Sequence, residues 1–412
     1  MPLGLNRYPS PTLRIRYVNP RSVSRTDFFK IARTELPNAG KALMVLSYPS
    51  HQMRRIRLFG VQSNAGIGVH SQALYRCLCR YEGDLFSVEF FNHASPPEVE
   101  SAVANTSATD VNICFFPESF ATRLSGICIY YAVFESNRPS PGYENWLEDF
   151  DFIFSPSTWG KNCMVQYGLP EERIFVVPEG VDPFAFHPFG RSPTKKDGPT
   201  RILMIGKYES RKGYAEALEA FRIAYQQEQN MELWLKADWV NPQGSAMHPE
   251  FIALAQGYTN LPVKLVSGLL NQAQMVDLYR QSDLFLFPSR CEGWGLPLIE
   301  AIASGLPAIC CDFGGQSEFL AAIPKMHVSV PYELARIDCP VWHNWYQHAD
   351  GNYGDWAKIS PDALAQKLVE AVRSPNLRAH GIAAANVIRN RFSWERSADR
   401  LVQQLTASKI IE

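Results

Sequence analysis

The chain has 412 residues, 46% of them hydrophobic, and a formal net charge of −1 at pH 7. This length predicts two domains, because a single core rarely grows beyond about 250 to 300 residues. The sequence has no run of about 18 apolar residues that would span a membrane, no apolar leader typical of a signal peptide, and no overall basic charge that would indicate a nucleic-acid partner. Nine cysteines without metal-site or disulfide spacing favour the reducing cytoplasm.

Basic residues are concentrated at the start of the chain. The first 60 residues contain eleven Arg and Lys but only two acids, Asp27 and Glu35. Residues 1–40, rich in Pro and Arg with weak periodicity, are predicted to form an extension. Their charge indicates either a solvated leader or contact with an anionic acceptor or membrane surface, the latter placing the protein at the inner face of a membrane.

Residues 41–190 alternate short apolar runs with helical or loop segments, which predicts βαβ units and a parallel sheet. The predicted strands are 41–48, 55–61, 86–91, 111–116, 127–134, 152–155 and 174–177, with helices at 69–80 and 157–167. The strand at 55–61 leads into a glycine loop that contains Gly66 and Gly68. These two glycines alone are weak evidence of a nucleotide site, because the complete dinucleotide fingerprint is absent.

The strand predicted at 127–134 runs into Glu135. Ligands of open α/β sheets bind at the carboxyl ends of strands, so Glu135 could orient or deprotonate an acceptor hydroxyl; the alternative is a loop acid that caps the next segment. Asp149 and Asp151 have the spacing of a metal-binding DxD pair, but no third ligand accompanies them, which favours a structural role. No histidine spacing indicates a metal site, and His70 behind the glycine loop is the histidine of most interest.

A segment rich in Pro, Gly and Lys at 183–199 is predicted to be a linker. Residues 191–390 then repeat the alternation, with strands at 201–205, 232–236, 263–266, 283–287 and 308–311 and helices at 214–226, 248–256, 271–281, 362–372 and 378–390. The strand at 201–205 is followed by a basic loop with Lys207 and Lys212. Fixed cations there would stabilise a diphosphate leaving group, although a basic loop alone is usually only solvated.

The strand at 283–287 ends in a second glycine loop. Gly295 permits a tight turn, and Pro297 suits the first turn of a following helix. Backbone N–H groups from Leu296 to Leu298 would then lie at the positive end of a helix dipole. This arrangement predicts an anion site that suits a phosphate.

Two acids flank this turn, Glu292 in the loop and Glu300 about one turn into the helix. Carboxylates beside a phosphate site suit the hydroxyls of a sugar; the plainer alternative is a solvated loop acid and a helix-dipole acid. The two acids are separated by seven residues that include Gly293, Gly295, Leu296 and Pro297. This pattern resembles the signature of the retaining glycosyltransferases of family 4, the group 1 glycosyltransferases.

The resemblance implies that Glu300 binds the nucleotide ribose and that Glu292 lies near the donor sugar and the reacting centre. Where several relatives have a His that contacts donor sugar or acceptor, this chain has Glu135. The resemblance further implies contacts to the substrates from four segments: Lys207 and Lys212, Gly66 and Gly68, Leu269 and Leu270, and the turn Gly295, Leu296, Pro297 and Leu298.

The resemblance covers about residues 54–406 and implies an α/β fold of GT-B architecture, in which two Rossmann-like domains with parallel sheets face each other across a cleft. The terminal helix, predicted at 394–406, is expected to cross back onto the first domain. Residues 41–190 with 391–412 would then form the acceptor side, and residues 191–390 would bind the nucleotide sugar.

The implied reaction is retaining transfer of a sugar from a GDP- or UDP-linked donor to a glycan, lipid-linked or small-molecule hydroxyl, without a metal or other cofactor. The Phe-Glu-Ser strand end resembles members that use GDP-mannose or related donors in polysaccharide or lipid-linked glycan synthesis. The alternatives are a GT-B phosphorylase or epimerase, and a noncatalytic subunit that binds nucleotide or glycan.

Residues 331–356 depart from the compact family domain. They crowd five large aromatic residues among polar side chains: Trp342, Trp345, Tyr346, Tyr353 and Trp356. Such aromatics either pin an insertion to the core or stack on sugar rings, and the first role is the commoner.

Overall fold

The computed structural model describes residues 54–411 apart from 64–65, 84, 118, 191–197, 242–243, 341–347 and 349. All of these residues belong to one compact unit, Gln52–Glu412. The extension predicted at 1–40 and the strand predicted at 41–48 lie outside the described residues.

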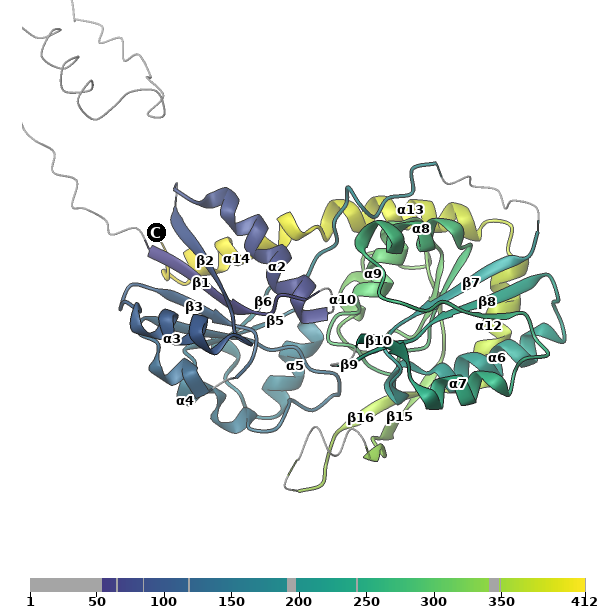
Figure 1. Ribbon diagram of the computed structural model, residues 1–412, viewed down its shortest axis with the longest axis horizontal. Helices are drawn as coiled ribbons and strands as arrows, with labels where there is room; N and C mark the ends of the chain where they lie inside the picture. Colours follow the sequence, from purple (N-terminus) through teal and green to yellow (C-terminus); the bar gives the residue numbers. More distant parts are fainter. Residues whose placement is uncertain are drawn as a thin grey trace, which may run out of the picture. The chain divides into compact units, whose positions relative to one another are not determined.

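Two six-stranded parallel sheets organise this unit, and each is the centre of what we call a lobe (Figure 1). Lobe 1 has the strand order β2-β1-β3-β4-β5-β6. Its strands are β1 (Arg54–Gly60), β2 (Phe86–Asn92), β3 (Val111–Cys114), β4 (Ile127–Tyr131), β5 (Phe152–Ser155) and β6 (Ile174–Val176). Its main helices are α2 (Gly66–Leu78), α3 (Pro96–Ala104), α4 (Trp146–Asp149) and α5 (Thr158–Gln166).

Lobe 2 has the strand order β11-β8-β7-β12-β13-β14, also parallel throughout. Its strands are β7 (Thr200–Ile205), β8 (Met231–Lys236), β11 (Val263–Leu265), β12 (Leu284–Phe287), β13 (Ala308–Cys310) and β14 (Val328–Ser329). Its helices are α6 (Tyr214–Tyr225), α7 (Pro249–Gln256), α8 (Gln272–Gln281), α9 (Leu296–Ala303), α10 (Ser317–Leu320), α12 (Pro361–Arg373) and α13 (Leu377–Arg391).

Strand β12 shows why the sheet of lobe 2 has helices on both faces. Its sequence Leu-Phe-Leu-Phe is buried at every position, as expected for a parallel strand covered on two sides. Leu284 and Leu286 join the core beneath α6 and α12, whereas Phe285 and Phe287 join the core beneath α8 and α9. Adjacent strands β7 and β12 form the point where the strand order reverses, and a crevice is expected at their carboxyl ends.

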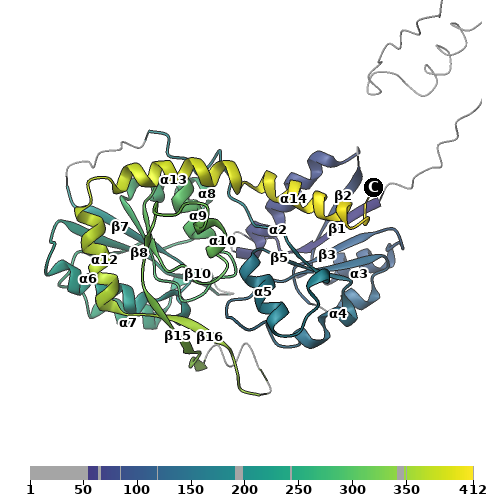
Figure 2. The same ribbon diagram turned by 180° about the vertical axis from the view of Figure 1, so that it is seen from behind.

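The chain ends by returning to lobe 1, as predicted. Helix α13 packs against α9 of lobe 2, and α14 (Trp394–Ala407) packs against α2 of lobe 1. Leu401 and Leu405 of α14 are fully buried in the same core as Leu74 of α2. Figures 1 and 2 show α14 beside α2 from both sides. None of the helices in the described part of the chain is long and apolar enough to cross a membrane.

Two antiparallel strand pairs in lobe 2 were not predicted. They are β9 (Asp238–Asn241) with β10 (Gly244–Met247), and β15 (Tyr332–Arg336) with β16 (Asp355–Ile359). Strand β16 also contacts lobe 1: the Asn137 side chain donates to Asp355 Oδ2 at 3.0 Å, and the Asp355 N–H donates back to Asn137 Oδ1 at 2.6 Å. The second pair therefore joins the two lobes.

Two of the basic residues near the start of the chain have a structural role. Arg57 is fully buried in β1 and lies within 3.4 Å of Asp110 and 3.2 Å of Glu89. Arg55 donates to both oxygens of Asp110, at 2.8 and 2.7 Å. These two cations are neutralised within lobe 1, so neither adds to a basic surface for a membrane or an anionic acceptor.

Candidate functional site

The loops that follow β7 and β12 meet at an ion pair between Lys212 and Glu292. Lys212 Nζ donates to the two Glu292 carboxylate oxygens at 2.7 and 2.9 Å. The close approach needs Gly213, which has φ 75° and would place a side-chain Cβ 2.4 Å from the Pro288 carbonyl oxygen. Both predicted site residues therefore lie at the crevice where lobe 2 reverses its strand order.

Glu292 is buried but ionised. Burial alone would raise its pKa, yet the charges of Arg211 and Lys212 outweigh burial and hold the pKa well below its usual range. Ser289 Oγ adds a hydrogen bond to Glu292 Oε1 at 2.5 Å, and the Gly315 N–H donates to the Glu292 carbonyl oxygen at 2.7 Å. The carboxylate is thus held by Arg211, Lys212 and Ser289, and the backbone of Glu292 is held by Gly315.

Arg211 is a site residue that the sequence analysis missed. It sits beside Lys212 in a short 3-10 turn, Ser210–Lys212, and its side chain is only 3% exposed. Its guanidinium lies 2.9 Å from Glu292 Oε2 and donates to Glu135 Oε1 at 2.6 Å. The available signal was two successive cations in the loop, of which only Lys212 was assigned a role.

Glu135 extends from the carboxyl end of β4 in lobe 1 toward these residues of lobe 2. Its carboxylate binds Arg211, and its backbone carbonyl accepts a 2.7 Å hydrogen bond from Trp356 Nε1. Burial raises the pKa of Glu135, although Arg211 and Lys212 counter the effect. The structure therefore brings Glu135, Glu292 and Lys212 together, as predicted from strand ends in two domains, while their chemical roles stay predictions.

The aromatic insertion is pinned to the core where the structure describes it. Trp356 is buried in the core of lobe 2 and reaches Glu135 as described. Arg138 Nη1 donates to Asp350 Oδ1 at 2.7 Å, a further link from lobe 1 to the insertion. Residues 341–347, which include three of the predicted aromatics, lie outside the described residues.

Helix α9 carries Glu300, as predicted, but its N-terminus offers fewer N–H groups than expected. Pro297 has no N–H, and the Leu298 N–H donates to the Gly295 carbonyl oxygen at 3.0 Å. In the part of the chain that the structure describes, the Leu296 N–H makes no hydrogen bond. Tyr279 OH donates to Glu300 Oε2 at 3.0 Å, yet burial raises the pKa of Glu300 to about 7.

The remaining predicted residues fall at the edges of this crevice. Lys207 is exposed and makes no ion pair with any described residue. Leu269 is 63% exposed, whereas Leu270 packs against the core of lobe 2. Lys236, which was not predicted, donates to the Gly268 carbonyl oxygen at 2.9 Å, and burial lowers its pKa. A second buried cation thus lies at the loop where the base was predicted to bind.

The glycine loop of lobe 1 starts helix α2. Gly66 is the first residue of α2 and has φ 29°. A Cβ on Gly68 would lie 2.2 Å from Ser63 Oγ and 2.5 Å from the Ser63 carbonyl oxygen. Gly68 is therefore required for the loop to fold back against the helix, which is a structural reason for the glycine beside the predicted substrate contact.

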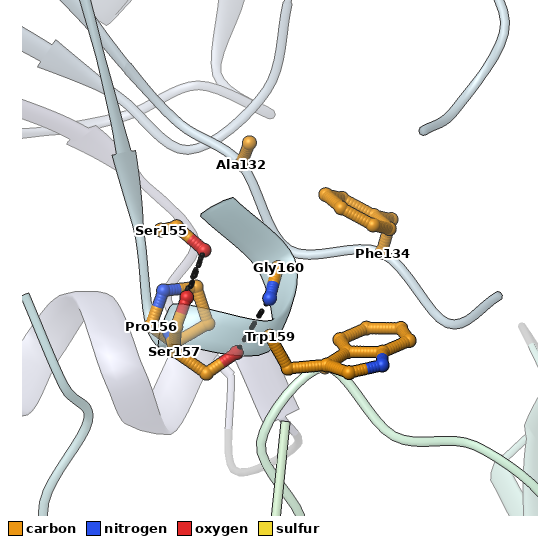
Figure 3. Close-up of a pocket in the computed structure, with 8 residues that line it drawn as sticks. Ala132, Phe134, Ser155, Pro156, Ser157, Trp159 and Gly160 are labelled. Carbon is orange, nitrogen blue, oxygen red and sulfur yellow. Dashed lines mark hydrogen bonds between the residues drawn. The ribbon is translucent and has the colours of Figure 1, made fainter. Parts of the chain in front are cut away.

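A small pocket opens at the carboxyl ends of β4 and β5, next to Gly293 of lobe 2. Figure 3 shows Phe134 and Trp159 together on one side and Ser155 and Ser157 on the other. The two aromatic rings have centroids 6.0 Å apart. Phe134, Ser155 and Ser157 are at most 3% exposed, and both serine hydroxyls are hydrogen-bonded within the loop. These groups therefore pack this edge of lobe 1 and do not present a surface to a ligand.

His70 and Glu179 form a buried contact behind the glycine loop. His70 Nδ1 lies 3.5 Å from Glu179 Oε1, and the imidazole packs against Phe115, Tyr131 and Trp394. Burial lowers the pKa of His70 to about 3. Burial, with a smaller contribution from Glu292, raises the pKa of Glu179 to about 8. Both groups are therefore mainly uncharged at neutral pH.

We expect Glu179→Gln to stabilise the protein more as the pH rises. Between the usual carboxyl pKa and about 8, the unfolded wild type loses the Glu179 proton while the folded protein keeps it, so wild-type stability falls. The variant cannot titrate there. Its advantage in unfolding free energy should grow by about 1 to 3 kcal/mol from pH 5 to pH 8 in thermal melts. Glu148→Gln, at an exposed carboxyl, should show no such trend; an equal pH trend in both variants would contradict the prediction.

One of the two acids considered as metal ligands, Asp151, has a structural partner. The Cys128 N–H donates to Asp151 Oδ2 at 2.9 Å, which accounts for one acid of the DxD pair. Among the described residues, one group has ligand atoms close enough for a metal ion: Cys310, Asp312 and His327, within 4.8 Å of one another. His327 Nε2 already lies 2.9 Å from Asp312 Oδ1, so a hydrogen bond accounts for this contact.

With this geometry in view, comparison with known proteins identifies lobe 2. Residues 189–323 match the model of the family described as glycosyl transferases group 1. Residues 189–323 therefore resemble a group 1 glycosyltransferase domain. The group 1 domain contains Lys212, Glu292 and Glu300, the residues on which the resemblance was based.

Two relatives of the chain are named as a glycosyltransferase and as a synthase of a sugar phosphate. The chain is 24% identical over 252 residues to a D-inositol 3-phosphate glycosyltransferase of Segniliparus rotundus, covering 59% of this chain and 49% of the relative. It is 27% identical over 158 residues to a mannosylfructose-phosphate synthase of Agrobacterium fabrum, covering 36% and 35%. The chain thus spans half or less of the length of these relatives.

Solved structures establish the fold around the group 1 domain. The structure of Anabaena Alr3699/HepE in complex with UDP and glucose aligns with a TM-score of 0.61 at 14% identity, covering 86% of this chain and all of that one. The glycosyltransferase WaaG, involved in lipopolysaccharide biosynthesis, aligns with a TM-score of 0.55 at 15% identity over the same shares. The protein has the GT-B fold, as the resemblance implied.

Proposed function

We propose that this protein is a retaining glycosyltransferase that moves a sugar from a nucleotide diphosphate sugar to a hydroxyl group of a glycan, a lipid-linked glycan or a small molecule. The proposal rests on the meeting of Lys212, Glu292 and Glu135 at the crevice of lobe 2. Cations for a diphosphate and carboxylates for hydroxyls are the groups that such a reaction requires.

The donor would lie along the carboxyl edge of lobe 2. Glu300 would accept hydrogen bonds from the ribose hydroxyls, a role that a carboxyl with a pKa near 7 can take up as an anion when donors replace lost water. The Leu296 N–H and Lys212 would contact the diphosphate. The base would lie near Leu269 and Leu270, beside the buried ammonium of Lys236.

The reaction we favour exchanges two bonds on one face of the sugar. The bond from the anomeric carbon to the diphosphate oxygen breaks with its electron pair, while the acceptor oxygen bonds to the same carbon. The acceptor proton passes to the departing phosphate oxygen. Lys212 and the exposed Lys207 would stabilise the charge of the leaving group, so this scheme requires neither a protein nucleophile nor a metal.

The acceptor would approach from lobe 1. Glu135 would orient its hydroxyl from the carboxyl end of β4, where Arg211 already binds the carboxylate. Relatives named for mannosyl transfer and for polysaccharide synthesis favour a mannose-like donor and a glycan or lipid-linked acceptor. The basic residues before Arg54 would suit an acceptor held at an anionic cytoplasmic membrane surface.

The test is a panel of UDP- and GDP-linked hexoses, scored for release of nucleoside diphosphate with and without acceptors. We expect release that depends on an acceptor and gives a product with the anomeric configuration of the donor. Glu300→Ala should weaken binding of the nucleoside diphosphate alone by about tenfold to a hundredfold in calorimetry, because charge-assisted hydrogen bonds are lost. Unchanged affinity would refute the ribose role.

The same panel separates the alternatives. Turnover that depends on free phosphate indicates a phosphorylase, and conversion of the donor without an acceptor indicates an epimerase. Binding without turnover of any donor indicates a noncatalytic subunit.

A further inference from the structure

Arg211 joins carboxylates from both lobes. Its guanidinium donates to Glu135 Oε1 at 2.6 Å and to Glu209 Oε2 at 3.0 Å, and it lies 2.9 Å from Glu292 Oε2. It also donates to the Cys291 carbonyl oxygen at 2.5 Å. Among the described residues, no other side chain bonds the carboxylates of both Glu135 and Glu292.

This arrangement exceeds what stability alone would favour. A buried guanidinium surrounded by carboxylates loses hydration that its ion pairs often only just recover, and apolar side chains of similar volume are frequently as stable. Moreover, the buried Nε of Arg211 has no hydrogen-bond partner among the residues that the structure describes, which adds an unrecovered cost. The fork-shaped guanidinium does provide one thing that apolar packing lacks, namely fixed distances to several oxygens at once.

Glu292 needs a second cation beside it because Lys212 is expected to bind the donor. Without substrate, Lys212 Nζ bonds both oxygens of Glu292. If Lys212 turns to a diphosphate, Glu292 loses this partner and would be free to move unless another cation holds it. Arg211 is already in contact with Glu292, and its side chain is only 3% exposed.

We propose that Arg211 is a positioning residue that keeps Glu135 of lobe 1 and Glu292 of lobe 2 in one arrangement while Lys212 binds the donor diphosphate. The inference rests on the proposed function. Arg211 orients the carboxylate of Glu135, and Trp356 fixes the same residue through its backbone carbonyl. The acceptor-side acid is thereby set relative to the donor site before either substrate binds.

The central variant is Arg211→Lys. Lysine keeps the positive charge but lacks the fork of N–H groups on the guanidinium, so it cannot hold the two carboxylates at fixed positions. We expect its kcat for transfer to an acceptor to fall about tenfold to thirtyfold, while the calorimetric affinity for the nucleoside diphosphate stays within about threefold of wild type. A variant that is simply unfolded would lose kcat and affinity for the nucleoside diphosphate in the same proportion.

A pH profile supplies a second readout. The charge of Arg211 lowers the pKa of both Glu135 and Glu292, against their burial, with Lys212 acting in the same sense and Glu209 adding negative charge at Glu135. Arg211→Gln should therefore move the acid limb of kcat against pH to higher pH. A purely structural loss would lower the profile without moving that limb.

Arg201→Lys is the matched control. Arg201 also pairs with an acid of lobe 2, Glu232 at 2.8 Å, but it lies in β7 at the amino end of the strand, away from the site. It should leave kcat unchanged. Glu135→Gln, which leaves the buried guanidinium in place, should give the same split between kcat and affinity as Arg211→Lys.

The outcomes are distinguishable. If wild type turns over no donor, the proposed function and this inference fail together. If wild type is active and Arg211→Lys retains kcat within twofold, or Glu135→Gln lowers only donor affinity, the positioning role fails while the function stands. If Arg211→Lys does not fold, the pH profile of Arg211→Gln decides the question, and an acid limb at the wild-type position refutes the positioning role.

Discussion

Gly315→Ala is expected to lower turnover about a hundredfold or more, because a misplacement of about 1 Å at a reacting centre has effects of this size. A Cβ at position 315 would lie 1.7 Å from the Gly293 carbonyl oxygen and 2.4 Å from its carbon. The Gly315 N–H also donates to the Glu292 carbonyl oxygen. Any movement that relieves the clash therefore displaces the loop that carries Glu292.

Lobe 1 prevents the loop from yielding in the other direction. A Cβ on Gly293 would lie 2.4 Å from Val133 Cγ1, so Gly293 is itself in close contact with the strand end of lobe 1. We expect a loss of stability of about 1 to 3 kcal/mol as well, as for other overpacked sites. Urea unfolding and donor turnover measure the two effects.

Gly257→Ala is the matched control for this substitution. Gly257 ends helix α7 in the same lobe with φ −64°, and its nearest neighbour to a new Cβ is the Leu254 carbonyl oxygen at 3.3 Å. That variant should behave as wild type. Equal activity of the Gly315 and Gly257 variants would show that the loops of Glu292 and Gly315 are not closely packed.

Several helices and strands that are set by their own local sequence were predicted correctly. Helix α13 was predicted at 378–390 and spans Leu377–Arg391, because a long run of helix formers sets it. Strands β9 and β10 are only two residues apart, so in that pair a local hairpin was overlooked. The pair β15 with β16 was missed because residues 337–354 separate its strands, and no local periodicity records their pairing. For the same reason the contact of β16 with Asn137 could not be read from either segment.

The site residues also divide into those that were predicted and those that were missed. Glu135 was predicted because it follows a strand, and ligands bind at the carboxyl ends of parallel strands. The roles of Lys212 and Glu292 were implied by the resemblance to the family 4 glycosyltransferases. Arg211 was missed because its burial depends on Glu135, which is 76 residues away in the chain. The expectation that Leu298 offers a free N–H was wrong because the tight turn at Gly295 uses that group itself.

Glu292→Gln is expected to have the second large effect, and on two properties. The change keeps the shape of the side chain but leaves the buried Arg211 and Lys212 without their shared anion. Breaking a buried ion pair by removing one partner costs about 3 to 5 kcal/mol. If Glu292 also stabilises positive charge at the donor sugar, turnover should fall about a hundredfold to a thousandfold.

The pH dependence of the unfolding free energy shows whether the lost ion pair or altered packing destabilises the Glu292→Gln variant. The pKa of Glu292 is depressed in the folded protein, so its contribution to stability is complete above the unfolded carboxyl pKa and is lost as the pH falls below it. The difference in unfolding free energy between wild type and Glu292→Gln should thus be largest near pH 7 and shrink below about pH 4.5. A difference that stays constant with pH would mean that packing, and not charge, causes the loss.

Glu216→Gln provides the comparison for charge loss alone. Glu216 forms an ion pair with Arg290 in the same lobe, with no contact to Lys212 or Glu135. Its removal should reduce stability less and leave turnover intact, because Arg290 stays 30% exposed and water can replace the lost partner. At Glu292, by contrast, we expect one carboxylate to affect stability, charge and turnover together, because the loops of β7 and β12 converge on it.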